Sequence, residues 1–112
     1  MKLPLQLTLR DIPHSEAVET AVREKAAKLD LLYPHIMRCQ VVIELAGKHK
    51  HQGKEFGVRI DLSVPGREIV VNREHGEDVY VVLRDAFDAA KRQLEDFAQK
   101  QRGEVKHHAG AV

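Results

Sequence analysis

The segment 48–54, with the sequence KHKHQGK, is the densest cluster of positive charge in the chain, with three lysines, two histidines and no acidic residue. Lysine ammonium groups bind anionic oxygens, so Lys48, Lys50 and Lys54 are candidate contacts to an anionic partner. The formal net charge of the whole chain is only +1. A basic segment on a nearly neutral chain predicts a local contact rather than diffuse charge attraction.

A second pair of lysines interrupts the apolar stripe of a predicted helix. This helix has Ser15 as its N-cap and stops at Pro34. Apolar residues recur along it at helical spacing: Val18, Ala21, Val22, Ala26, Leu29 and Leu32. Lys25 falls in the middle of this stripe and Lys28 at its edge. Because an unpaired ammonium is costly to bury, the amine of Lys25 should emerge at the rim, on the same flank as Lys28. A snorkelling lysine with no ligand is the alternative.

A longer helix is predicted over about residues 77–102. Its apolar stripe comprises Val79, Val82, Leu83, Ala86, Phe87, Ala90, Leu94 and Phe97. Arg84 and Lys91 are seven residues apart and share a face. Arg92 has an aspartate four positions away on either side, a spacing that favours weak surface ion pairs. Arg92 therefore fits a solvated role as well as a ligand contact.

The histidines raise the question of a metal site. His49 and His51, and likewise His107 and His108, could chelate, but a zinc site needs three or four ligands held by structure. Cys39 falls in the inward phase of a predicted strand, where a free cysteine is usually inert. The common nucleotide-binding, metalloprotease and hydrolase motifs do not occur in the sequence. We therefore predict no metal, no cofactor, no small-molecule substrate and no enzymatic activity.

Four segments alternate apolar and polar residues, as half-buried strands do: 3–9, 37–45, 55–64 and 68–72. Together with the helices they give the order β-α-β-β-β-α. We predict an α+β fold with both helices on one face of a four-stranded, mostly antiparallel sheet. The first two strands should be parallel if they are neighbours. The segment 48–54 then forms the tip of a hairpin.

The length of 112 residues allows one domain, which we place at 1–102. Gly103 is a candidate C′ residue that ends the second helix, and 103–112 is predicted to be a flexible C-terminal tail. No apolar run is long enough to cross a membrane, and no signal peptide is evident. A single cysteine agrees with a reducing compartment, so a cytoplasmic location without membrane contact is expected.

The order of elements resembles the double-stranded-RNA-binding-domain topology with one strand added in front. Short sequence strings give a more specific resemblance. In their order and spacing they resemble motifs of the ribosome hibernation-promoting factors, also called ribosome-associated inhibitors. These strings are EKAAKL at 24–29, YPHI at 33–36, VPG at 64–66, EI at 68–69, DVY at 78–80 and KRQL at 91–94. The resemblance covers about residues 3–102.

The resemblance implies a non-enzymatic factor that binds small-subunit rRNA near the decoding centre and inhibits translation under stress. Members of this family hold rRNA phosphates with basic side chains of both helices and nearby strand ends. Four contacts follow from the resemblance: Lys25, Lys28, Lys91 and Arg92. The charge pattern of this chain adds four more: Lys48, Lys50, Lys54 and Arg84. Such contacts position a protein on RNA without reading its sequence.

The second helix departs from the family pattern. It carries Asp85, Asp88, Glu95 and Asp96 where better-known short members carry lysines. Binding is therefore expected to be weaker, or shifted toward the first helix and the hairpin tip. Two alternatives stay open. One is a general module for structured RNA, and the other is a small histidine-dependent metal-binding protein that uses the hairpin tip.

Overall fold

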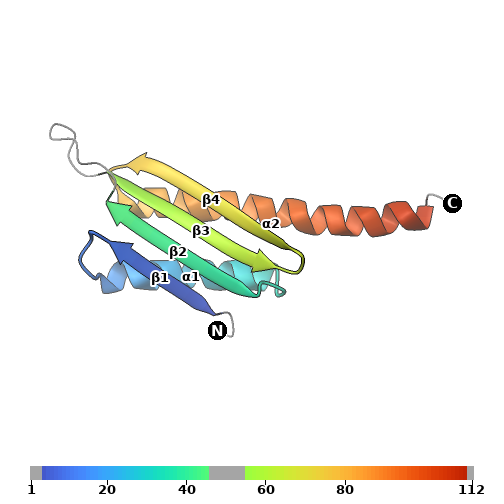
Figure 1. Cartoon of the computed structure of the whole chain (residues 1–112), viewed down its shortest axis with the longest axis horizontal. Coiled ribbons are helices and arrows are strands. Elements are labelled where there is room, and N and C mark those ends of the chain that lie inside the picture. The colour runs from blue at the N-terminus through green and yellow to red at the C-terminus, as the bar shows by residue number, and fades with distance from the viewer. Residues whose placement is uncertain (1–3, 46–54, 111–112) are drawn as a thin grey trace.

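The computed structural model describes residues 4–45 and 55–110, and the side chains of these residues except 73–75 and 102–110. The element order is β1 (Leu5–Arg10), α1 (Glu16–Leu32), β2 (Arg38–Leu45), β3 (Phe56–Val64), β4 (Arg67–Gly76) and α2 (Val79–Gly110). This is the predicted order β-α-β-β-β-α. The four strands form one sheet in the order β1-β2-β3-β4. Both helices lie on the same side of this sheet (Figure 1).

The strand pairing confirms the predicted topology. β1 is parallel to β2, with Leu7 opposite Val41. The other two pairs are antiparallel. A parallel pair needs a long crossover, and α1 supplies it between β1 and β2. β3 and β4 are joined at Pro65-Gly66, where Gly66 has a φ of 80°. A positive φ at the third position of the turn is what a type II turn requires, and glycine adopts it without steric cost.

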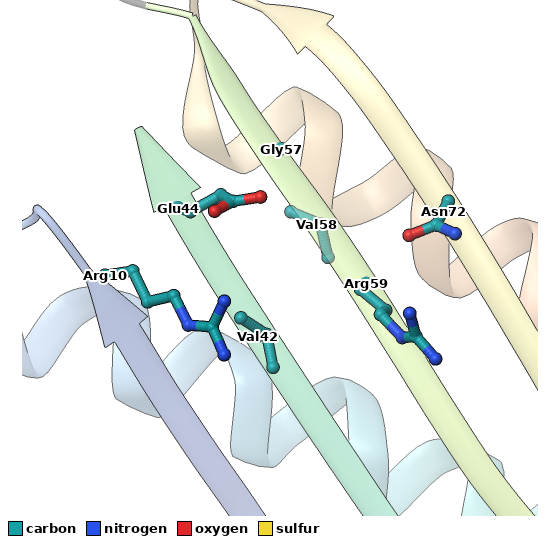
Figure 2. A pocket seen from close by; sticks show the side chains of 7 residues that line it. All are labelled: Arg10, Val42, Glu44, Gly57, Val58, Arg59 and Asn72. Atoms are coloured by element: carbon teal, nitrogen blue, oxygen red, sulfur yellow. The ribbon is translucent and has the colours of Figure 1, made fainter. Parts of the chain in front are cut away.

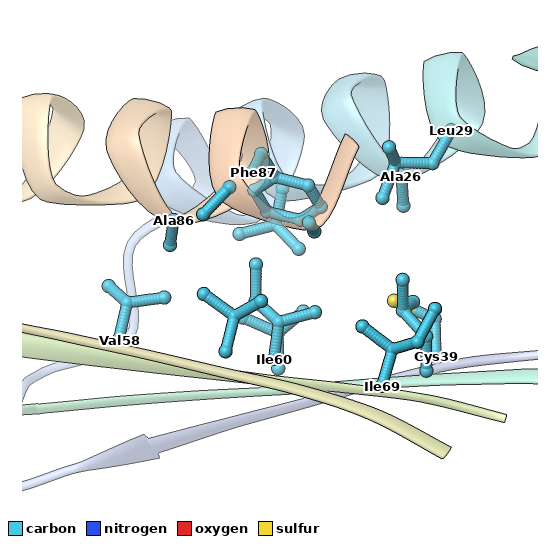
Figure 3. Packing of buried hydrophobic residues seen from close by; sticks show 14 of the residues in the cluster. Ala26, Leu29, Cys39, Val58, Ile60, Ile69, Ala86 and Phe87 are labelled. Carbon is cyan, nitrogen blue, oxygen red and sulfur yellow. The ribbon is translucent and has the colours of Figure 1, made fainter. Parts of the chain in front are cut away.

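The core fills the space between the helices and the inward face of the sheet (Figure 3). Alternation along β2 and β3 places one side of each strand in this layer, where Cys39, Ile43, Ile60 and Leu62 have no exposed area. The leucines of β1 are only partly buried and pack against the edge of the core. The described residues include no buried polar or charged side chain, so every described charged side chain reaches the surface.

Local signals account for the ends of α1. The Ser15 Oγ accepts a hydrogen bond from the backbone N–H of Val18 at 3.3 Å, which satisfies one of the free amides of the first turn. Glu16 and Glu19 lie in that turn and complement its positive end. At the other end, the N–H of Tyr33 donates to the carbonyl oxygen of Leu29 at 2.9 Å. The predicted start and stop of this helix are confirmed.

Two residues that the sequence pattern places on inward faces are exposed: Leu32 by the period of the first helix, and Met37 by its alternation in phase with Cys39. Leu32 is 43% exposed and Met37 is 56% exposed. Leu32 lies in the last turn of α1, where it borders the groove between the helices instead of the sheet. Met37 lies one residue before β2, at the end of the sheet. Periodicity shows which face of an element a residue occupies, but it does not show whether that part of the element lies over the core. Both residues lie at the end of an element, which explains why they are exposed.

The predicted end of the second helix at Arg102 is wrong, because α2 continues through Gly103 to Gly110. Glycine in a helix costs about 1 kcal/mol relative to alanine, which weakens a helix without ending it. Among the described glycines, only Gly66 has a positive φ, so Gly103 does not form the predicted C′ cap. The end of α2 projects beyond the sheet (Figure 1). The division into a domain at 1–102 and a tail at 103–112 stays a prediction.

Candidate nucleic-acid interface between the helices

A shallow groove runs between α1 and α2 on the outer surface of the helix layer. It consists of two hollows that share Lys25 and Lys28. The first is also lined by Leu29, Leu32, Phe87, Asp88 and Lys91. The second is also lined by Ala21, Glu24, Tyr80, Val81 and Arg84. We call the two hollows together the interhelix groove.

The interhelix groove brings together the two lysines predicted on α1. Lys25 is half-buried and Lys28 is exposed, as expected for a stem that crosses apolar surface and an amine that reaches its rim. Within the described part of the chain, neither makes a hydrogen bond or an ion pair. The prediction that both lysines lie on one flank is confirmed, and neither amine forms an ion pair with a described carboxylate.

Two of the three cations predicted on α2 line the same groove. Lys91 lies in the first hollow and Arg84 in the second. Arg84 donates hydrogen bonds to Asp85 Oδ1 from Nε at 3.3 Å and from Nη2 at 3.2 Å. Arg92 is exposed but lies outside both hollows. It makes no ion pair with either of its neighbouring aspartates, so the pairing expected from its spacing does not form.

The remaining predicted cations, Lys48, Lys50 and Lys54, lie outside the described residues, as do His49 and His51. Their contact with an anionic partner stays a prediction. Among the described side chains, which exclude those of 73–75 and 102–110, no group of three or more histidine, cysteine, aspartate or glutamate residues is placed to hold a metal ion. None of the described helices is long and apolar enough to cross a membrane.

The charge of the groove is positive but mixed. Lys25, Lys28, Arg84 and Lys91 line it together with the carboxylates Glu24 and Asp88. Its floor is apolar, because Leu29 and Phe87 are almost fully buried beneath it. The hollows measure about 370 and 380 Å³ and are open to solvent. Small-molecule sites of roughly this size enclose most of their ligand, whereas these hollows are open on one side and suit contact with a larger surface.

Sequence reasoning missed Tyr80 and Val81, which also line the groove. They are 46% and 41% exposed. The helical period places both outside the apolar stripe of α2. Two large apolar or aromatic residues at outward positions were the signal in the sequence that could have identified them. An exposed tyrosine beside cations is a feature of surfaces that bind unpaired bases.

A third hollow lies on the opposite side of the molecule, on the sheet face that carries no helix. Figure 2 shows Arg10, Val42, Glu44, Arg59 and Asn72 projecting from the four strands into it. Arg59 is occupied within the sheet, since its Nε donates to Asp61 Oδ1 at 2.9 Å and that carboxylate raises the pKa of Arg59. Among the described residues, this hollow is lined by fewer unpaired cations than the interhelix groove, which is therefore the stronger candidate.

Cys39 does not form a reactive centre. It is fully buried on β2, and burial, followed by the negative charge of Asp61, raises the pKa of its thiol from 9.0 to about 12. Only the thiolate is a nucleophile. Near neutral pH, a pKa raised by this amount makes the thiolate fraction about 1,000-fold smaller than that of an ordinary thiol. The prediction that this cysteine is inert agrees with its burial.

We expect Cys39 in the folded protein to react with iodoacetamide at least about 1,000-fold more slowly than a free thiol at pH 8. The rate should rise with pH as the thiolate forms. The measurement is mass spectrometry of the alkylated protein over time, with protein unfolded in guanidinium chloride as the control. Fast alkylation without denaturant would contradict both the burial and the raised pKa.

Known proteins resemble the chain over most of its length. A family described as Sigma 54 modulation protein / S30EA ribosomal protein matches residues 5–102. A relative from Pseudomonas putida, named Ribosome hibernation promoting factor, is 35% identical over 80 residues, which are 71% of this chain and 72% of the relative. The family match runs from the start of β1 into α2 and includes α1 and all four strands.

Solved structures share the fold. A ribosomal subunit interface protein from Coxiella burnetii superposes with a TM-score of 0.74 at 16% identity, and the match covers 87% of this chain and 99% of that one. The N-terminal domain of Protein Y from Thermus thermophilus gives a TM-score of 0.70 at 26% identity, with the same coverage. At 16% identity the first likeness is evidence of fold alone.

Proposed function

The chain belongs to the Sigma 54 modulation protein / S30EA ribosomal protein family, and on this premise we propose that it is a ribosome hibernation factor that binds small-subunit rRNA through the interhelix groove. It binds near the decoding centre and inhibits translation by occupying the path of mRNA and tRNA. The proposal requires no chemical step, and contact with the ribosome would place the protein in the cytoplasm. The names of the similar proteins support the ribosome as the partner.

The observation that carries the proposal is the convergence of four predicted cations on one groove. Lys25 and Lys28 come from α1, and Arg84 and Lys91 come from α2. Their sequence positions are up to 66 residues apart, and the packing of both helices on one sheet face brings them together. The sheet beneath the helices fixes this spacing.

The geometry suits the RNA backbone better than base edges. Ammonium and guanidinium groups around a shallow surface contact phosphate oxygens from several directions. Folded RNA presents its backbone and its shape on the outside, and its deep major groove excludes side chains. Arg84 can exchange its exposed bonds to Asp85 for a phosphate, because a surface pair contributes only about 0–1 kcal/mol.

Binding to small subunits should weaken steeply with salt. Each phosphate contact contributes about 0.7–0.9 to the slope of log affinity against log salt concentration, so the four groove cations predict a slope of about −3. Sedimentation of the protein with isolated small subunits across a salt series measures it. Large subunits and an unrelated RNA duplex serve as controls. A steeper slope would indicate that Arg92 or the lysines at 48, 50 and 54 also contribute.

The same experiment separates the proposal from its alternatives. Preferential retention by small subunits supports a ribosome-specific factor, and protection of decoding-centre nucleotides from chemical cleavage supports the location. Equal retention by small subunits and by the unrelated duplex would instead indicate a general module for structured RNA. Binding that is independent of salt would contradict phosphate recognition altogether.

A further inference from the structure

Tyr80 has an environment unlike that of the other aromatic side chains. The chain contains two tyrosines, three phenylalanines and no tryptophan. Tyr33, Phe87 and Phe97 are buried, Phe56 is half-buried, and Tyr80 alone is exposed. The Tyr33 hydroxyl donates to Gln101 Oε1 at 3.4 Å, and its ring packs edge-on against Phe97. The Tyr80 ring and hydroxyl make no such contact with any described residue.

The backbone of Tyr80 is held in place although its side chain is free. Its N–H donates to Asp78 Oδ1 at 2.9 Å, and the N–H groups of Val81 and Val82 donate to the carbonyl oxygen of Asp78 at 3.1 Å. Asp78 thus caps the first turn of α2. Val82 and Leu83, which follow directly, are anchored in the core. The backbone that carries the ring is therefore held in place beside the second hollow.

Three cations share that hollow with Tyr80. Lys25 and Lys28 lie across it on α1, and Arg84 lies one turn further along α2. An aromatic face bordered by positive charge is the arrangement by which proteins hold unpaired nucleotides, since the ring stacks on a base while the cations contact the flanking phosphates. Paired bases in a duplex are already stacked, so an exposed ring would add nothing to duplex binding.

From this juxtaposition we propose that the interhelix groove takes an unpaired RNA nucleotide, whose base stacks on Tyr80 while its flanking phosphates contact Lys25, Lys28 and Arg84. The inference rests on the proposed RNA-binding function and narrows it, from contact with the backbone of folded RNA to capture of an extruded or single-stranded base. Stacking tolerates any base, because every base has a π face. Tyr80 thereby selects the local structure of the RNA rather than its sequence.

The test compares Tyr80→Ala and Tyr80→Phe with the unchanged protein. The probes are a labelled oligouridylate, whose bases are unpaired, and a blunt RNA duplex of matched charge, each followed by fluorescence anisotropy. Tyr80→Ala should weaken oligouridylate binding by roughly 5- to 150-fold, the range expected for one stacked base. Tyr80→Phe keeps the ring and should restore that affinity. Duplex affinity and the salt slope should not change in Tyr80→Ala, because no phosphate contact is removed.

Tyrosine fluorescence gives an independent readout, because the chain has no tryptophan. Stacking should quench the emission of Tyr80 when oligouridylate is added. The quenching should persist in Tyr33→Phe and disappear in Tyr80→Phe. Circular dichroism of each variant checks that the fold is intact, as expected for an exposed position.

The outcomes separate this inference from the function on which it rests. Unchanged oligouridylate binding by Tyr80→Ala, or equal losses for oligouridylate and duplex, would overturn the stacking role. If the stacking role were overturned but small subunits still retained the protein without substitutions, the proposed function would stand without the stacking role. If Tyr80→Ala lost oligouridylate binding while small subunits never retained the protein, the stacking role would hold and the ribosomal assignment would fail.

Discussion

Replacing Lys25 and Lys28 together by glutamate is expected to weaken binding to small ribosomal subunits by about 100-fold, with the fold retained. Both lysines line the interhelix groove, and neither forms an ion pair with a described carboxylate. The change removes two attractive contacts and places two negative charges beside phosphates. A loss of about 100-fold corresponds to roughly 3 kcal/mol, or less than 1 kcal/mol for each of the four units of charge altered. Quantitative co-sedimentation at fixed salt measures it.

A matched control has the same change of charge on the opposite face. Arg10→Glu with Arg38→Glu alters two exposed arginines of the bare sheet face. Figure 2 shows Arg10 there, and the alternation along β2 places Arg38 on the side opposite the buried Cys39. We expect this variant to lose little affinity, because its charges lie away from the groove. Lys25→Gln with Lys28→Gln, which removes charge without reversing it, should fall between the two. Equal losses in the two glutamate variants would mean that net charge governs binding and that the groove is not the site.

Substitution of Gly76 by alanine is expected to destabilise the fold by about 2 kcal/mol. Gly76 ends β4, and a Cβ at this position would overlap Cγ2 of Val82 in the first turn of α2. Val82 is buried in the core, so it cannot move aside without disturbing its neighbours. Inserting a methyl group into a packed site costs roughly 1–3 kcal/mol. For a domain of this size the midpoint of thermal unfolding should fall by roughly 8 °C, as measured by calorimetry.

A double-mutant cycle tests the proposed cause. Val82→Ala alone should destabilise the protein, because it leaves a cavity. Combined with Gly76→Ala it should destabilise less than the sum of the two single changes, because the alanine at position 82 makes room for the new methyl group. Additive effects would show that the cost at Gly76 arises from the backbone and not from contact with Val82.

Periodicity was sufficient to predict the architecture. Alternation in β2 and β3 identified the inward residues, and the stripe containing Val22 and Ala26 identified the inward face of α1. Periodicity failed for residues at or near the ends of helices and strands, where the surroundings depend on how far the element extends. Leu32 matches the period of α1, but the last turn extends beside the groove. Gly103 matches a cap signal, but the helix continues past it at a modest cost.

The candidate site was only partly predictable for a related reason. A one-dimensional pattern separates inward from outward positions, which was enough to detect Lys25 as an exception within its stripe. It does not show which outward residues of two helices face each other. That relation depends on how α1 and α2 cross the sheet, and it places Lys91 and Arg84 in the groove while Arg92 lies outside. It also gives Tyr80 cationic neighbours that are more than fifty positions away in sequence.

The burial of Cys39 makes the chain suited to site-directed labelling. It is the single cysteine of the chain and lies in the core. A thiol introduced by mutation at an exposed position would therefore be the one group to accept a maleimide-linked photocrosslinker under native conditions. Attached in turn along the rim of α2 and along the bare face of the sheet, such a crosslinker would reveal which side of the protein lies against RNA.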